Sequence, residues 1–132
     1  MKRVADVVTQ ASRSDEPTYA FIGGLVERHP LLAPLLSEHL AEPDGILTHT
    51  FISDVERWLQ ARTRDGQLEL VTPIMATIEE QFSKGNDRVQ GLLAVSFLWL
   101  IGVPGTADDE LVGHLGPTMR HAFEAMHPFE FH

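Results

Sequence analysis

The sequence predicts an all-α fold, in one domain of six or seven helices. Apolar residues recur at the 3.6-residue spacing of helices along most of the chain. Glycine and proline interrupt this pattern at short intervals, as they do between helices of modest length. The only strand candidate is residues 4–8, which suits a short N-terminal helix equally well. With 132 residues, the chain is long enough to bury one core.

Three helices are predicted in the first half, over residues 18–28, 31–40 and 46–63. Gly23 and Gly24 lower the helix propensity of the first one. The third carries its polar residues on the face opposite its apolar stripe, at Asp54, Glu56, Arg57 and Arg62. The apolar stripes of the three helices are, in order, Tyr19, Ile22 and Val26; Leu32, Leu35, Leu36 and Leu40; and Phe51, Ile52, Val55, Trp58 and Leu59.

A fourth helix carries the stripe Val71, Ile74, Met75, Ile78 and Phe82. Thr72 and Pro73 suit an N-cap followed by proline at the first helical position. A start near Leu68, with Pro73 inside the first turns, is the alternative. Gly85 ends this helix, and Asn86 is placed to cap the next one.

The helix predicted at 87–101 is apolar on nearly all sides after Gln90. Such a helix is normally buried on nearly all sides, so we expect it to be the central core helix. A short helix at 107–114 should follow, with Thr106 and Asp109 resembling a capping box. The last helix carries Met119, Ala122, Phe123 and Met126, and residues 127–132 form a tail. Consecutive helices from 46 to 127 could stack as HEAT-like pairs.

Composition excludes several classes of function. The formal net charge of −9 argues against binding to nucleic acid or to an anionic membrane, since both need clustered cations. The absence of cysteine excludes disulfides, cysteine zinc sites and thiol chemistry. No signal-peptide core follows the N-terminus, and the longest apolar run, of about 12 residues, is short of the roughly 20 that span a bilayer. We therefore expect a cytoplasmic protein.

No catalytic constellation emerges from the sequence. Ser96 has no base near it in sequence, and its hydroxyl is expected to bond a carbonyl one turn earlier. Seven histidines are present, but none forms a His-x-x-x-His pair. We expect neither a metal nor a cofactor. The weakest hypothesis is an enzyme or metal-binding protein centred on His49, Asp54, Glu110 and His114, of which the last two have i,i+4 spacing.

The acidic residues concentrate in the second half of the chain. Residues 66–132 hold the larger share of the excess negative charge, with clusters at Glu79-Glu80 and at 108–110. Neighbouring carboxylates on a helix point about 100° apart, so Glu79 and Glu80 cannot share a proton. The clusters either keep the protein in solution or form a docking face for a basic partner.

The stretch Asn86–Leu98 resembles a motif of small, all-helical bacterial proteins that look like immunity proteins of polymorphic or contact-dependent toxin systems. Residues 48–59 and 115–120 resemble flanking motifs of the same proteins, so the resemblance covers about 46–124. The sequence departs from them at Trp99-Leu100, where they tend to carry a Glu-Asn pair. The resemblance implies a non-enzymatic protein that binds and neutralises a cognate toxin.

The resulting hypothesis is an immunity protein whose acidic surface blocks the basic active site of a toxin domain, for example a nuclease. The alternative is a helical regulatory module with a non-toxin partner. The residues predicted to bind the partner are Glu79, Glu80, Asp87, Asp108, Asp109 and Glu110.

Overall fold

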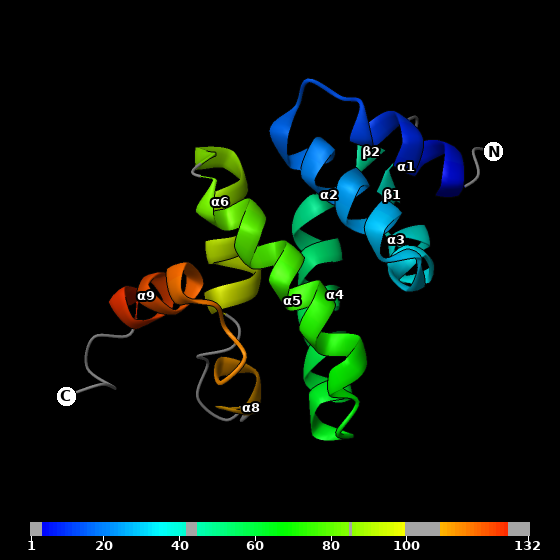
Figure 1. Ribbon diagram of the computed structural model, residues 1–132. Helices are drawn as coiled ribbons and strands as arrows, with labels where there is room; N and C mark the ends of the chain where they lie inside the picture. The colour runs from blue at the N-terminus through cyan, green and yellow to red at the C-terminus, as the bar shows by residue number, and fades with distance from the viewer. Residues whose placement is uncertain (1–3, 42–44, 85, 100–108, 127–132) are drawn as a thin grey trace.

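The computed structural model describes residues 4–41, 45–84, 86–99 and 109–126, and within them it confirms the predicted all-α class with six or seven helices (Figure 1). Leu40–Ala41 (β1) and Gly45–Ile46 (β2) pair as a minimal antiparallel ladder. The helical segments are α1 (Val4–Ser12), α2 (Pro17–Arg28), the 3₁₀ turn η1 (Pro30–Leu32), α3 (Ala33–Ser37), α4 (Thr48–Arg64), α5 (Leu68–Ser83), α6 (Asp87–Leu93), the π-helical turn η2 (Ala94–Leu98), α8 (Asp109–Val112) and α9 (Pro117–Met126). The HEAT-like pairing stays a prediction.

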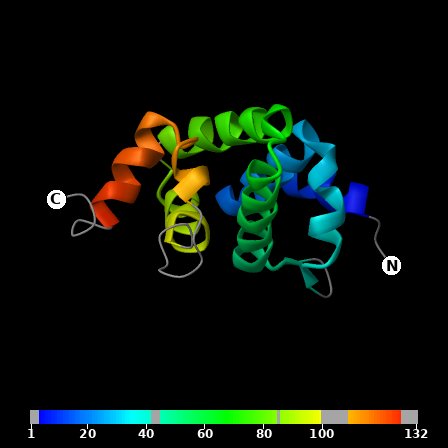
Figure 2. The same cartoon turned by 90° about the horizontal axis from the view of Figure 1, so that it is seen from below.

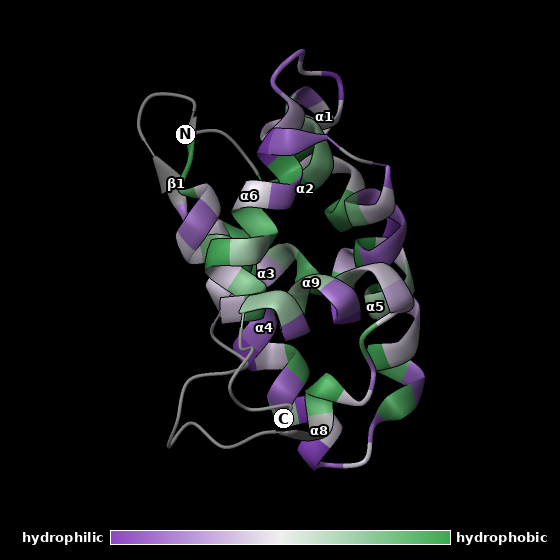
Figure 3. Ribbon diagram, turned by 90° about the vertical axis from the view of Figure 1, so that its left-hand side faces the viewer, coloured by the Kyte–Doolittle hydropathy of each residue, from purple (hydrophilic) through white to green (hydrophobic). Residues whose placement is uncertain are grey.

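Helix α4 lies between the two ends of the molecule. Figure 1 shows α1–α3 at one end and α8–α9 at the other, and in Figure 2 α5 runs along one side between them. Helix α4 packs against α2, α3, α5, α6, η2 and α8. Hydrophobic and hydrophilic residues alternate along α4, α5 and α9 (Figure 3), as amphipathic helices require. The predicted stripe of α4 is buried, with Phe51, Ile52, Val55 and Leu59 fully inaccessible to solvent.

The N-terminal residues form helix α1, which packs closely on α2. A Cβ atom on Gly23 would lie 2.3 Å from the backbone nitrogen of Ser12, so a larger residue there would force the helices apart. The glycine that lowers the helix propensity of α2 thus permits the backbone of α1 to approach α2 closely.

Helix α5 begins at Leu68, so the alternative start is confirmed and Pro73 lies inside the helix. Proline there removes one backbone donor without ending the helix. The predicted cap on the next helix is also present. Asn86 Oδ1 accepts hydrogen bonds from the backbone nitrogens of Arg88 and Val89, at 3.0 and 3.1 Å.

The helix predicted at 87–101 is the continuous segment α6–η2. The expectation that it is buried on nearly all sides is wrong, because only one side packs against other helices. Leu93, Phe97 and Leu98 are fully inaccessible to solvent. On the other side, Val95 is 61% exposed and Trp99 52% exposed. None of the described helices is long and apolar enough to cross a membrane.

The structure corrects the prediction for Glu56 and describes only part of the predicted C-terminal segments. Glu56, predicted on the polar face of α4, is only 2% exposed, and Gln60 Nε2 donates a hydrogen bond to its Oε1; this part of the prediction is wrong. Within 107–114 the described helix is α8, of four residues. Thr106 and the tail at 127–132 lie outside the described residues.

Candidate functional site

Glu79, which the sequence predicts to bind a partner, instead connects α5 to the start of α9. Its two carboxylate oxygens accept hydrogen bonds from the backbone nitrogens of Thr118 and Met119, at 3.2 and 2.9 Å. These donors belong to the first turn of α9, which Gly116 precedes without a side chain to cap it. A Cβ on Gly116 would lie 2.4 Å from the Glu79 side chain, so glycine leaves room for this long-range cap.

Glu80 is exposed and bridges two cations. Its carboxylate pairs with Arg28 at 3.3 Å and with Lys84 at 3.5 Å. The hydrogen bond and charge of Arg28, followed by the charge of Lys84, lower the pKa of Glu80. Glu79 and Glu80 line a hollow of about 390 Å³ between α5 and the loop before α9, together with His114.

Asp87 lies elsewhere, at the exposed start of α6, and lines a different hollow. Asp108 lies outside the described residues. Asp109 and Glu110 belong to α8, and their side chains are outside the described part of the structure. The described members of the predicted set therefore divide between two places, one on α5 and one on α6.

An exposed face runs along α6–η2. Asp87, Gly91, Val95 and Trp99 recur four residues apart and are all exposed. A Cβ on Gly91 would meet nothing within 4 Å, so the middle of this face is open. We name these four residues the α6–η2 face. It places one carboxylate at the start of the helix and two large apolar side chains further along.

An open hollow of about 530 Å³ lies beside this face. Residues of α2, α4 and α6 line it, including Tyr19, His49, Asp87, Arg88 and Gly91. Arg88 forms an ion pair with Glu16, which also accepts hydrogen bonds from Thr18. The bonds from Thr18 are the largest cause of the lowered pKa of Glu16. The hollow therefore has both charged and apolar lining residues, and its arginine already has a carboxylate partner.

Ser96 lies in the π-helical turn and contacts His49 across the helix interface. His49 Nδ1 and Ser96 Oγ are 2.5 Å apart, so the expected bond to a carbonyl one turn earlier is replaced by a histidine partner. A nucleophilic serine must reach a substrate, but Ser96 is only 4% exposed. We interpret this pair as a structural contact that links α4 to η2.

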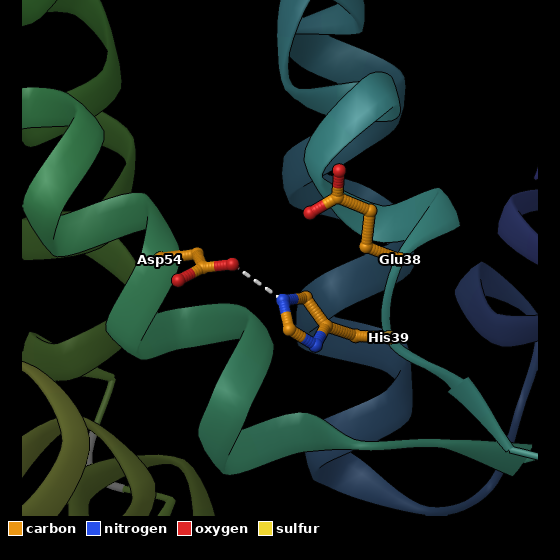
Figure 4. Close-up of side chains that lie close together, drawn as sticks. All are labelled: Glu38, His39 and Asp54. Carbon is orange, nitrogen blue, oxygen red and sulfur yellow. Dashed lines mark hydrogen bonds and ion pairs between the residues drawn. The ribbon is translucent and has the colours of Figure 1, made fainter.

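The residues of the metal hypothesis have separate partners. His49 contacts Ser96, His114 lines the hollow beside Glu79, and Asp54 contacts His39. The side chain of Glu110 is outside the described part. Asp54 Oδ2 and His39 Nε2 are 2.5 Å apart, and Glu38 lies beside them (Figure 4). Glu38 and His39 were not singled out from the sequence, because their partner is on another helix.

Family comparison covers most of the chain. A family model described as a domain of unknown function (DUF7674) matches residues 22–129. The chain belongs to this family. No curated protein and no solved structure matches it. The matched range of this DUF7674 chain contains the α6–η2 face and the Glu38–His39–Asp54 group.

Most described lysine and arginine side chains of this DUF7674 chain are already paired with carboxylates. The paired cations are Arg28, Arg57, Arg62, Lys84, Arg88 and Arg120. Arg62 also lies over the Trp58 ring, 5.7 Å from its centroid. The acidic side chains outnumber the cations, and this excess gives the chain its formal net charge of −9.

Proposed function

We propose that this chain is a non-enzymatic immunity protein that binds and neutralises a basic toxin domain through the α6–η2 face. The observation that carries the proposal is the exposure of Val95 and Trp99 beside Asp87, on a chain with a net charge of −9. Tryptophan is among the residues that dominate binding energy in protein interfaces, and an acidic field speeds encounter with a basic partner.

The ion pairs of the described cations support the proposal that the partner is basic. Among the described cations, Arg28, Lys84 and Arg88 already have carboxylate partners in Glu80 and Glu16. Exposed carboxylates such as Asp87 can instead meet lysine or arginine of the partner. Glu79 is not part of the proposed binding surface, because its carboxylate caps α9.

The resemblance of residues 86–98 to immunity proteins supports the same choice. Trp99, at the point where the sequence departs from the resembled pattern, is on the exposed face. A tryptophan at a binding face would give this chain a contact that a polar residue does not provide.

The test uses the protein encoded by the neighbouring gene. Co-expression should relieve the toxicity of that protein, and the two should bind with an association rate that falls as salt rises. Trp99→Ser should weaken binding by about tenfold or more. Leu68→Ser is the matched control, because Leu68 is 41% exposed at the start of α5, away from α6 (Figure 1).

Each outcome decides one part of the proposal. No binding to the neighbouring protein at micromolar concentration would contradict the immunity function. Tight binding to a partner that is harmless when expressed alone would favour the regulatory module instead. Binding that Trp99→Ser and Leu68→Ser leave equally unchanged would place the interface away from the α6–η2 face.

A further inference from the structure

Three potential metal ligands converge where the segment after α3 meets α4. One ligand atom from each of Glu38, His39 and Asp54 lies within 4.8 Å of the other two. Glu38 and His39 follow the last residue of α3, and Asp54 comes from the second turn of α4. In Figure 4 the Asp54 carboxylate faces His39 Nε2, and the Glu38 carboxylate lies above the ring in that view. The group combines one nitrogen with two carboxylate donors.

The Asp54 carboxylate is held in place from two sides. Its Oδ2 is 2.5 Å from His39 Nε2, and its Oδ1 accepts a hydrogen bond from Arg57 at 2.8 Å. Hydrogen bonds to the outer oxygen of a carboxylate ligand are the usual way in which proteins orient it. The His39 and Asp54 side chains are only 16% and 24% exposed, whereas Glu38 is exposed. The group is therefore ordered on its inner side and open to solvent at Glu38.

We propose that Glu38, His39 and Asp54 bind a divalent first-row transition metal ion, with Zn²⁺ as the reference ion. An imidazole nitrogen with carboxylate oxygens suits zinc, whereas Mg²⁺ and Ca²⁺ prefer oxygen donors alone. The ion would replace the hydrogen between Nε2 and Oδ2, and that proton would leave to solvent. Three protein ligands leave a fourth position for water.

The rearrangement that binding requires is small. Bonds of about 2.0–2.2 Å to a tetrahedral ion place ligand atoms roughly 3.3–3.6 Å apart. His39 and Asp54 must therefore separate from their present 2.5 Å. Glu38 must move toward them, and its side chain is exposed to solvent.

Binding would fasten the segment after α3 to α4. Because the ligands come together only in the folded chain, zinc would stabilise the native state in proportion to its concentration. This site is independent of the α6–η2 face, so its failure would leave the immunity proposal standing.

The experiment is calorimetric titration of the metal-depleted full chain with zinc chloride at neutral pH. We expect one ion per chain. Glu38→Gln and His39→Gln should each weaken binding by about tenfold or more. His121→Gln is the matched control, since His121 is exposed on α9 and should not change the affinity. Absorption bands of bound Co²⁺ give a second readout, because their intensity reports the coordination geometry.

Glu38→Gln keeps the test decisive if His39→Gln disturbs the fold. Glu38 is exposed, so its variant should retain the wild-type circular dichroism spectrum. No saturable binding of zinc to the wild-type chain would overturn the proposal. Equal affinity of Glu38→Gln and wild type, or equal weakening by His121→Gln, would assign the binding to adventitious histidines and overturn it as well.

Discussion

The two sides of α6–η2 both carry large apolar side chains, but the protein buries only one of them. Leu93 and Phe97 are fully buried, whereas Val95 and Trp99 on the same turns are more than half exposed. Helices α2, α4, α5 and α9 pack against α6–η2, and Val95 and Trp99 remain exposed. When a helix carries apolar residues on all sides, the sequence pattern does not show which side is buried. The neighbouring helices then determine which residues belong to the core. The exposed side is the surface that we propose for the partner.

The largest expected effect comes from the buried side. Phe97→Ala removes a fully buried aromatic ring beside α4 and should lower the free energy of unfolding by about 3–5 kcal/mol. Urea unfolding followed by circular dichroism measures the loss. Trp99→Ala is the matched control, because the same type of truncation on the exposed side leaves no closed cavity.

Similar losses of unfolding free energy in the two variants would contradict the difference between the two sides of the helix. They would mean that Trp99 packs against the protein in solution as tightly as Phe97 does. A loss from Phe97→Ala several times larger than that from Trp99→Ala would support that difference.

The two neighbouring acids on α5 extend the comparison to charged residues. Glu79→Ala removes the two hydrogen bonds that cap α9 and should cost about 0.5–2 kcal/mol, the usual range for loss of a cap. Glu80→Ala should cost markedly less, because its ion pairs with Arg28 and Lys84 are exposed to solvent. Thermal unfolding of both variants measures the difference. If Glu80→Ala is the more damaging, the long-range cap does not stabilise α9.

The helices could be predicted because each apolar stripe is a local property. The stripes of α4, α5 and α9 contain buried residues as expected, among them Ile52, Ile78 and Met119. Asn86 was recognisable as a cap for the same reason, since its bonds reach only two and three residues along the chain. The start of α5 remained open because propensity alone does not decide whether Pro73 lies at the first position or inside the first turns.

Interactions between helices could not be predicted from one sequence. Glu79 looked like a free surface acid because its backbone partners are about 40 residues away. The same holds for Ser96 with His49, and for His39 with Asp54. Spacing rules connect residues on one helix, so they could not place His39 beside Asp54.

A smaller effect is expected from a polar side chain within the fold. His29 Nε2 lies 2.8 Å from Thr77 Oγ1, and partial burial, followed by the charge of Arg28, lowers the pKa of His29. Above its ordinary pKa of about 6.5, His29 is neutral in both the folded and the unfolded chain. Below that pH the unfolded chain takes up the proton first, so stability falls with pH until the folded chain is protonated too.

His29→Gln should remove this part of the pH dependence. The change in unfolding free energy between neutral and mildly acidic pH should be smaller in the variant than in the wild-type chain. His121→Gln, on the surface of α9, should retain the wild-type profile in this range. An unchanged profile in His29→Gln would show that other groups cause the acid sensitivity.

The smallest expected effect on stability is at the centre of the exposed side. Val95 is 61% exposed, so Val95→Ser removes little buried surface and should change the free energy of unfolding by no more than about 0.5 kcal/mol. The same substitution should weaken binding to the partner, because a hydroxyl replaces an apolar contact in the interface. Urea unfolding and partner binding measured on one preparation separate the two effects. A large loss of stability without loss of binding would assign Val95 to the core and remove the main reason to regard this side of the helix as a binding surface.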